Sequence, residues 1–286
     1  MKISQVIEAI RYFHGIVEKS RFDRVIYGET ERECTGIVVT CSATVEIIRA
    51  AAQQGANLIV CHEPVFYTGC DDETLIQGVK LVEAKKKLLD EAGITIWRDH
   101  DHMHGGGKPG QDQNIIPRIP HPGEKTDYIF YGIMKILGWE EYLVGNITKP
   151  LLYEIPETDV PSLCAFLMDR LNLNGVRIVG KADAKVRRVF FCEHVNERHD
   201  EDLYQRMDSL NADVFIPLEI IDWTLSSYIR DAVAMGENKA ILEMGHFYVE
   251  EAGMRYLAES VLPSLFGSSL PVSYIQSGDS FRYIVR

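Results

Sequence analysis

The chain has 286 residues, 46% of them hydrophobic and 25% charged, which is the balance of a globular protein with one large or two medium domains. Its net charge of −12 and its pI of about 5.2 argue against an extensive nucleic-acid surface, which needs basic side chains. No apolar stretch is long enough to span a membrane, and the first 20 residues are expected to form an amphipathic helix and not a secretory signal. The six irregularly spaced cysteines predict reduced, buried thiols in a cytoplasmic protein.

The first half of the sequence alternates between strand and helix patterns. Short apolar runs predict strands at 36–42, 57–62 and 94–99. Helical patterns lie between them, at 43–54 and in a Lys- and Glu-rich stretch ending near residue 92. Strands separated by helices of this length indicate parallel βαβ units.

The second half repeats this alternation after a Gly- and Pro-rich segment, residues 105–125, that predicts a long loop. Such a loop could be a lid over a site or a contact between subunits. Helices are expected at 127–137, 160–172, 202–210, 223–235 and 248–265. Strands are expected at 176–180, 187–194, 213–220 and 240–246, and two apolar segments, 272–277 and 281–286, close the chain.

The predicted fold class is therefore α/β, with parallel or mixed sheets flanked by helices. We expect three segments: a first α/β segment at 1–125, a middle and possibly inserted segment at 126–209, and a closing α/β segment at 210–286. In this prediction the first and last segments carry metal ligands, so that both ends of the sequence contribute to one centre.

The first candidate site follows the strand at 57–62. His62 and Glu63 stand side by side where that strand ends, and ligands in parallel sheets bind beyond the carboxyl ends of strands. Adjacent imidazole and carboxylate groups could serve two neighbouring ions. The alternative is a polar pair that caps the strand at the surface.

The second candidate follows the strand at 94–99, where His100, His102 and His104 alternate with other residues before three glycines. An extended chain would place all three imidazoles on one face. A curled chain would place only His100 and His104 together. Imidazole is a common ligand of Zn, Mn, Fe and similar ions, so this run predicts metal binding; the alternative is a solvated polar loop.

The third candidate is His246 with Glu250, between the strand at 240–246 and a helix. Residues four apart share a face in a first helical turn. The pattern lacks the second histidine of a zinc-protease HExxH motif, and the alternative is a helix start with a favourable carboxylate. If the sheet is parallel, all three candidates lie along one edge. His194 and His199 flank a charged loop that is interpreted as solvated; the alternative is that they line a cleft.

Taken in order, these motifs resemble the NIF-three-like family, also described as GTP cyclohydrolase I type 2 homologues. The stretch GIVVTCSATVEIIRAAAQQGANLIVCHEPVF resembles the family's early strand, helix and strand, which end in a His-His-Pro segment. RDHDHMHGGG resembles its His-x-x-x-Asp segment, and ILEMGHFYVEEAG resembles its Gly-His-x-x-x-Glu ending. The similarity covers about residues 30–105 and 210–265.

This resemblance implies a two-part α/β chain, a homo-oligomer in the form of a ring-shaped hexamer, and two divalent metal ions per chain. The metal ligands it implies are His62, Glu63, His104, His246 and Glu250. His100 and His102 are then candidates for supporting groups or for the catalytic general acid. Zn, Mn, Fe, Ni and Mg all suit such a donor set.

The sequence departs from the family pattern at two of these positions. Glu63 replaces the second histidine of the usual pair, and His104 replaces the usual aspartate. Because one change removes a histidine and the other adds one, the donor inventory stays the same. Our hypothesis is that the two changes compensate.

Three functional interpretations stay open. A metal-dependent hydrolase of a nucleotide or another small phosphorylated molecule comes first, because paired metal ions polarise electrophiles and supply hydroxide at neutral pH. The second is a metal-binding or regulatory interaction protein without turnover. The third is an oxidoreductase-like iron site with open coordination positions.

Overall fold

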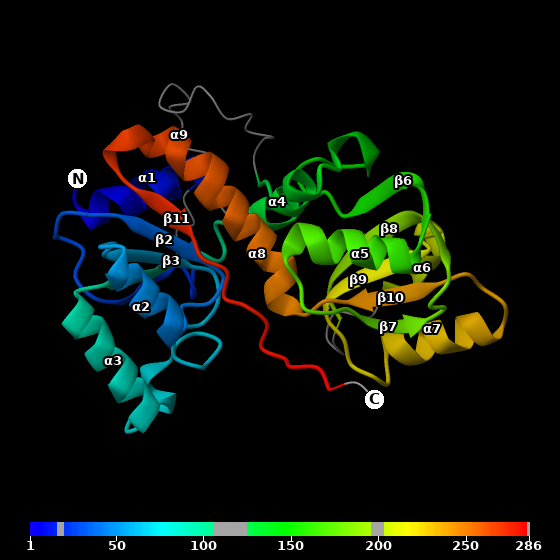
Figure 1. Ribbon diagram of the computed structural model, residues 1–286, viewed down its shortest axis with the longest axis horizontal. Coiled ribbons are helices and arrows are strands. Elements are labelled where there is room, and N and C mark those ends of the chain that lie inside the picture. Colours follow the sequence, from blue (N-terminus) through cyan, green and yellow to red (C-terminus); the bar gives the residue numbers. More distant parts are fainter. Residues whose placement is uncertain (16–19, 106–124, 196–202, 285–286) are drawn as a thin grey trace. The chain divides into compact units, whose positions relative to one another are not determined.

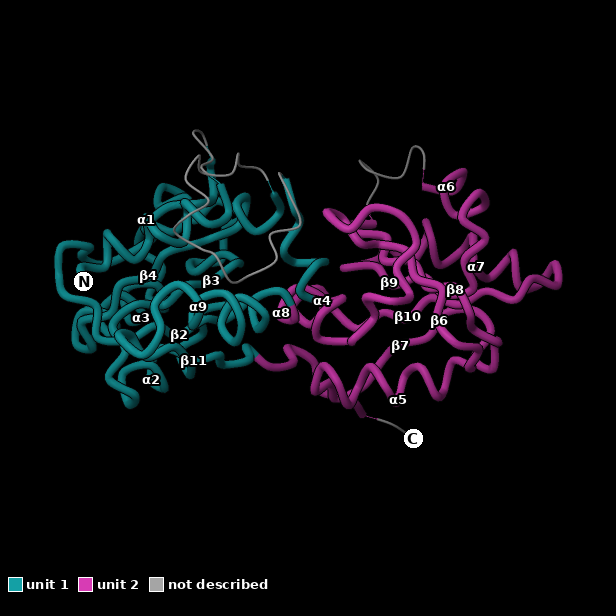
Figure 2. The backbone as a smooth tube through the Cα atoms, turned by 90° about the horizontal axis from the view of Figure 1, so that it is seen from above, with its two compact units in different colours: residues 1–132, 253–277 teal, residues 133–252, 278–286 magenta. Residues whose placement is uncertain are grey.

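The computed structural model describes residues 1–15, 20–105, 125–195 and 203–284. Apart from its two ends, the predicted loop at 105–125 lies outside the described residues, and so does His199. The chain divides into two compact units (Figure 2). Unit 1 comprises residues 1–132 and 253–277, and unit 2 comprises residues 133–252 and 278–286. The three segments predicted at 1–125, 126–209 and 210–286 stay a prediction.

Unit 1 is built on a five-stranded sheet in the order β1-β4-β3-β2-β11 (Figure 1). The neighbours β4, β3, β2 and β11 run parallel, and β1 pairs antiparallel with β4. The strands are β1 (Arg24–Tyr27), β2 (Ile37–Thr40), β3 (Leu58–Cys61), β4 (Thr95–Arg98) and β11 (Val272–Tyr274). Every residue of β2, β3 and β4 is buried, as expected for a parallel sheet covered on both faces.

Helices cover both faces of this sheet, with α2 and α3 on one side and α1 and α9 on the other (Figure 1). They are α1 (Ile3–His14), α2 (Val45–Gln53), α3 (Lys80–Ala92) and α9 (Leu262–Phe266), which follows a π-helical turn at Leu257–Val261. Thr44 caps α2 by accepting a hydrogen bond from the amide of Ile47 at 3.3 Å. Gly93 ends α3 in the left-handed conformation that favours glycine.

Unit 2 contains a six-stranded sheet in the order β5-β6-β8-β9-β10-β7. Its strands are β5 (Leu143–Val144), β6 (Leu152–Asp159), β7 (Arg177–Gly180), β8 (Lys185–His194), β9 (Val214–Glu219) and β10 (Ala240–Glu243). The central strands β8, β9 and β10 run parallel, whereas β5, β6 and β7 join by antiparallel pairing. The predicted α/β class with mixed sheets is confirmed.

The helices of unit 2 are α5 (Val160–Leu171), α6 (Leu203–Leu210) and α7 (Leu225–Ala234). Leu203 and Met207 of α6 and Ile229 of α7 share one buried cluster with Phe190 and Phe215 of the sheet. Two further helices, α4 (Tyr128–Leu137) and α8 (His246–Tyr256), have residues in both units.

Within unit 1, Gly253 of α8 lies against Ile129 of α4. A Cβ atom at residue 253 would stand only 2.6 Å from the Ile129 Cα, so no larger side chain fits without a shift.

All six cysteines are described and all are free thiols, as the sequence predicts. Four of them are buried as expected, whereas Cys34 and Cys70 are only half-buried. Cys61 is fully buried at the end of β3, and burial raises the pKa of its thiol to about 12. Such a thiol stays protonated and acts as a small apolar side chain. No helix among the described residues combines the length and the hydropathy needed to cross a membrane.

Candidate metal centre

Three histidines converge at the carboxyl ends of two adjacent strands in unit 1. His62 follows β3, and His100 and His104 lie in the turn after β4, which is paired with β3 in parallel register. One ring nitrogen from each of the three lies within 4.8 Å of the others. The His62 and His100 rings stack with centroids 4.6 Å apart, and His104 meets both edge-on. This spacing is compatible with one shared cation.

The chain curls after β4, which decides between the two arrangements left open above. The amide of His104 donates to the carbonyl of His100 at 3.1 Å, and Gly105 donates to His102 at the same distance. His100 and His104 therefore lie on the same side of the turn, as residues four apart do in a helix. His102 lies on the opposite side, where it is buried between Asp23 and Asp99.

Gly105 ends this turn with a positive φ of 72°. A Cβ atom there would stand 2.5 Å from the carbonyl oxygen of Lys125. The first glycine after His104 is therefore required by a close approach of the backbone.

Each histidine of the group is oriented by an acceptor at its Nδ1 atom. His62 Nδ1 lies 3.0 Å from the backbone carbonyl of Asp99, and His100 Nδ1 lies 3.0 Å from Asp101 Oδ1. His104 Nδ1 lies 3.2 Å from Asp127 Oδ2. From these partners we infer that each ring carries its proton on Nδ1 and its lone pair on Nε2, the arrangement that metal-ligating histidines adopt.

The electrostatics around His100 favour its neutral form. Burial lowers the pKa of His100 to about 4, and the neighbouring rings of His62 and His104 add to this effect. A histidine with such a pKa is unprotonated at pH 7, which is the form that binds a cation.

Two carboxylates that the motifs did not identify hold this turn in place. Asp23 accepts hydrogen bonds from the successive amides of His100, Asp101 and His102. Asp127 caps α4 through its Oδ1 atom, which accepts from the amides of Ile129 and Phe130, while its Oδ2 atom meets His104. Asp127 thus ties the start of α4 to the histidine group.

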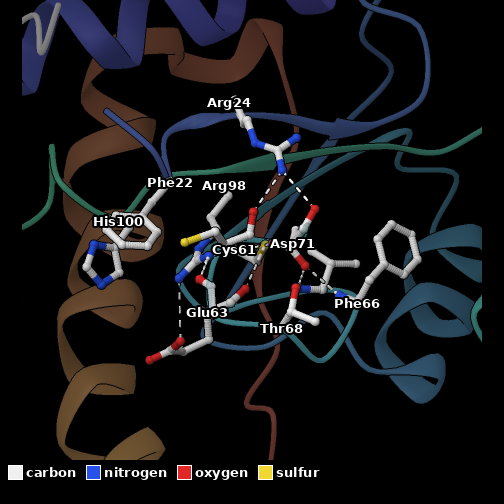
Figure 3. Close-up of polar contacts among 12 residues, drawn as sticks. Phe22, Arg24, Cys61, Glu63, Phe66, Thr68, Asp71, Arg98 and His100 are labelled. Carbon is white, nitrogen blue, oxygen red and sulfur yellow. Dashed lines mark hydrogen bonds and ion pairs between the residues drawn. The ribbon is translucent and has the colours of Figure 1, made fainter. Parts of the chain in front are cut away.

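Arg98, the last residue of β4, supports the loop that carries His62 and Glu63 (Figure 3). Its side chain is buried, and it donates to the carbonyls of His62 at 2.8 Å and Gly69 at 2.7 Å. Its guanidinium also lies 3.7 Å from Glu63 Oε2 and 3.6 Å from Asp71 Oδ2. Because Arg98 makes these hydrogen bonds and ion pairs with the loop, it fixes the path of the loop.

Asp71 closes the same loop from its other end (Figure 3). Its Oδ1 atom accepts from the amides of Val65 and Phe66 at 2.8 and 2.6 Å. Arg24 donates to the carbonyls of Cys70 and Asp71 at 2.9 and 3.0 Å. Among the predicted ligands in unit 1, the structure groups His62 with His104 and adds His100, while the Glu63 carboxylate lies at ion-pair distance from Arg98.

Unit 2 holds a second group, formed by His194, Glu219 and His246 at the ends of the parallel strands β8, β9 and β10. Glu219 meets both rings: its Oε1 atom lies 2.8 Å from His194 Nδ1, and its Oε2 atom lies 2.9 Å from His246 Nδ1. Burial alone would raise the pKa of Glu219, but the two histidines lower it to about 2. Glu219 is therefore a carboxylate at neutral pH.

His246 and Glu250 share one face of α8, as their spacing predicts, with His246 Nε2 3.0 Å from Glu250 Oε2. Glu219 holds the opposite ring nitrogen, so the His246 ring is oriented from both sides.

Two expectations need correction. β10 belongs to the six-stranded sheet and not to the sheet of β3 and β4, so the three motifs do not share one sheet edge. His194 is the last residue of β8 and contacts Glu219, so it is not part of a solvated loop.

Comparisons with known proteins point to the same family as the ordered motifs in the sequence. Residues 1–100 match the model of the Duf34/NIF3 (NGG1p interacting factor 3) family. A protein of Clostridium perfringens named "GTP cyclohydrolase 1 type 2 homolog" is 23% identical over 297 aligned residues, which cover 99% of this chain and 100% of that protein. Both matches are to proteins of the kind that the motifs resemble, which confirms the resemblance seen in the sequence.

Solved structures extend the likeness across the fold. A hypothetical protein of Staphylococcus aureus has a TM-score of 0.68 at 16% identity, and the match covers 99% of both chains. A Bacillus cereus protein related to NIF3 has a TM-score of 0.65 at 12% identity, again with 99% of both chains covered. At these identities the likeness shows the shared fold alone.

Proposed function

We propose that this chain binds divalent metal ions and uses them to hydrolyse a nucleotide or another small phosphorylated molecule. The observation that carries the metal part is the group of His62, His100 and His104, whose rings converge while each Nδ1 atom meets a protein acceptor. Those acceptors orient the rings as metal ligands require. In this proposal the three Nε2 atoms hold one ion.

The second ion of the proposed centre draws on Glu63, His246 and Glu250. The support for this part is the order of the family motifs and the donor chemistry of the residues, together with the orientation of His246 by Glu219 within unit 2. A mixed set of imidazoles and carboxylates without thiolates suits Zn, Mn, Fe or Ni better than softer metals.

Bound metal ions would act as Lewis acids toward a phosphoryl or carbonyl oxygen and lower the pKa of water. The chain's own residues then have positional tasks. Asp23 and Arg98 hold the two loops that present the histidines, and Asp127 fixes the ring of His104. His102 is buried against Asp23 and Asp99, so it acts on the centre by supporting the turn.

Metal content tests the centre directly. We would measure ions per chain by mass spectrometry on protein purified without added metal or a histidine tag, beside a His62→Ala, His246→Ala double variant. The proposal expects the double variant to hold about two ions fewer per chain than the parent. Equal metal content in the two proteins would refute the dinuclear centre.

Turnover needs its own measurement. The metal-loaded protein should release phosphate or a dephosphorylated product from at least one member of a panel of nucleotides, sugar phosphates and phosphodiesters, and the double variant should not. An intact metal centre with no hydrolysis of phosphoesters or cyclic amides would favour the alternative proposal, a regulatory protein that assembles as a ring. Light scattering on the eluted protein would then test for a hexamer.

A further inference from the structure

Four ionisable side chains lie buried together on the side of the turn opposite His62, His100 and His104. They are His14 at the end of α1, Asp23 ahead of β1, Asp99 after β4, and His102 within the turn. All four belong to unit 1, and each side chain is at most 1% exposed. Ionisable groups are rarely buried so completely unless they pair or bind a metal.

The distances join these side chains into one group. His102 Nδ1 lies 2.7 Å from Asp23 Oδ2 and 3.4 Å from Asp99 Oδ1. His14 Nε2 lies 3.4 Å from Asp99 Oδ2, the other oxygen of the same carboxylate. One ligand atom from each of Asp23, Asp99 and His102 lies within 4.8 Å of the others.

The two carboxylates differ in how well the protein satisfies them. Asp23 accepts three backbone amide hydrogen bonds, so its charge is well supported. Among the described residues, no contact of the Asp99 carboxylate oxygens or of the His14 ring nitrogens has the geometry of a hydrogen bond, and the imidazoles of His14 and His102 stand 3.4 Å from the Asp99 oxygens. A buried carboxylate in this condition costs several kcal/mol of desolvation unless a positive charge compensates it.

We propose that Asp23, Asp99 and His102 bind a divalent cation of the zinc or manganese type, with His14 on the far side of Asp99 as the fourth group of the site. Two carboxylates and one dication sum to zero charge, which removes the cost of burying Asp99. In a tetrahedral site with bonds of about 2.1 Å, ligand atoms stand about 3.4 Å apart. The 3.4 Å between His102 Nδ1 and Asp99 Oδ1 equals this spacing, whereas the 2.7 Å between His102 Nδ1 and Asp23 Oδ2 is shorter, so that pair would move apart when the ion binds.

This site is separate from the histidine group, although the two share a turn. The backbone carbonyl of Asp99 accepts from His62 Nδ1, whereas the Asp99 carboxylate faces His14 and His102. Because all its side chains are buried, the proposed site is closed to substrates, as structural metal sites are. Its role would be to fix the turn that carries His100 and His104. The inference does not depend on the proposed hydrolase activity.

The test counts ions in variants of the full chain. A quadruple variant, His62→Ala, His100→Ala, His104→Ala and His246→Ala, removes at least one histidine from each of the other groups that could hold an ion. After a chelator wash and reloading with Zn²⁺ or Co²⁺, this variant should retain one ion per chain. X-ray absorption should report one imidazole and oxygen ligands for that ion, or two imidazoles if His14 binds directly. Adding Asp99→Asn to the quadruple variant should remove the ion.

Asp71→Asn is the matched control, because Asp71 is another buried carboxylate of unit 1 that lies outside this group. On the quadruple background it should leave the ion in place. If the quadruple variant retains no ion, the proposal is overturned, and His102 is then a protonated partner of the two carboxylates. Should Asp99→Asn fail to fold, the ion count and the ligand signature of the quadruple variant still decide. Failure of the proposed dinuclear centre would show separately, as an unchanged ion count between the parent and the His62→Ala, His246→Ala variant.

Discussion

The two histidine groups of this protein are built in contrasting ways. In unit 1, three imidazoles meet, and each has its own acceptor at Nδ1: a backbone carbonyl, Asp101 or Asp127. In unit 2, two imidazoles share the single carboxylate of Glu219. In unit 1, His62 is fully buried and the side chains of His100 and His104 are 23% and 25% exposed. In unit 2, the side chains of His194, Glu219 and His246 are 43%, 38% and 29% exposed.

This difference shows how buried hydrogen-bonding partners and contact with water determine how firmly the side chains of a site are held. The unit 1 group lies on two loops that are held by buried polar side chains. Arg98 holds the loop that carries His62, and Asp23 holds the turn that carries His100 and His104. The unit 2 group has more contact with water, which screens its charges. We therefore expect substitutions around the first group to have larger effects than matched substitutions around the second.

The largest expected effect comes from removing Arg98. In Arg98→Met, the carbonyls of His62 and Gly69 lose their donor, and the buried Asp71 carboxylate loses its positive neighbour. Breaking a buried charged network from one side costs about 3–5 kcal/mol. Urea unfolding of the metal-free protein should show this loss in the free energy of unfolding.

Arg255→Met is the matched control within unit 1. Arg255 pairs with Glu259 one helical turn away, and both side chains are 40% or more exposed. An exposed pair of this kind contributes at most about 1 kcal/mol. If the two variants lose equal stability, Arg98 does not act as the buried support that distinguishes the first group.

The next largest effect should follow Asp127→Asn. Asparagine has nearly the same shape as aspartate, but its neutral amide oxygen is a weaker hydrogen-bond acceptor for His104 Nδ1. Changing the partner of a metal-ligating histidine commonly costs 10- to 100-fold in metal affinity. Competition with a chromophoric chelator would measure the change. Asp127 also caps α4, and asparagine caps about as well as aspartate, so stability should change little. A fall in stability without a fall in affinity would assign Asp127 to the helix alone.

How well the sequence predicts each part depends on whether the signal is local. The strands β2, β3 and β4 are buried on both faces, so their apolar runs were recognised within a residue or two of their observed bounds. β6 was missed because it is partly exposed, carries Pro156 and pairs with β8 in an irregular register.

The same reasoning explains the candidate sites. His62, His100 and His104 converge because neighbouring parallel strands bring their carboxyl ends together, a rule that can be applied without a structure. Asp23 and Arg98 could not be found in this way. Asp23 reaches His100 from 77 positions away in the sequence, and its role depends on how the chain packs. Glu219 stood in a predicted strand, but only the pairing of β8 with β9 reveals its partner His194.

A smaller effect is expected from Glu219→Gln in unit 2. The amide still offers an oxygen to one histidine, but it loses the charge that favours a proton on Nδ1 of His194 and His246. Changing the partner of a metal-ligating histidine weakens metal binding 10- to 100-fold. Since this group is partly exposed, we expect metal binding to weaken about tenfold at most. A loss as large as that of Asp127→Asn would remove the contrast between the two groups.

The smallest expected effect is the pH dependence of stability that His100 contributes in the metal-free protein. Its pKa is about 4 in the folded chain and about 6.5 in the unfolded chain. Between these values the unfolded state binds more protons, so the free energy of unfolding should rise with pH from 4 to 6.5. One such group contributes a slope of at most about 1.4 kcal/mol per pH unit.

His100→Gln should flatten that rise, since glutamine does not titrate. The measurement is urea unfolding of the parent and the variant at several pH values between 4 and 7. His194→Gln in unit 2 is the comparison, because the partly exposed His194 lies beside a carboxylate instead of beside other imidazoles. Equal flattening of the rise in the two variants would show that burial of His100 does not distinguish the first group from the second.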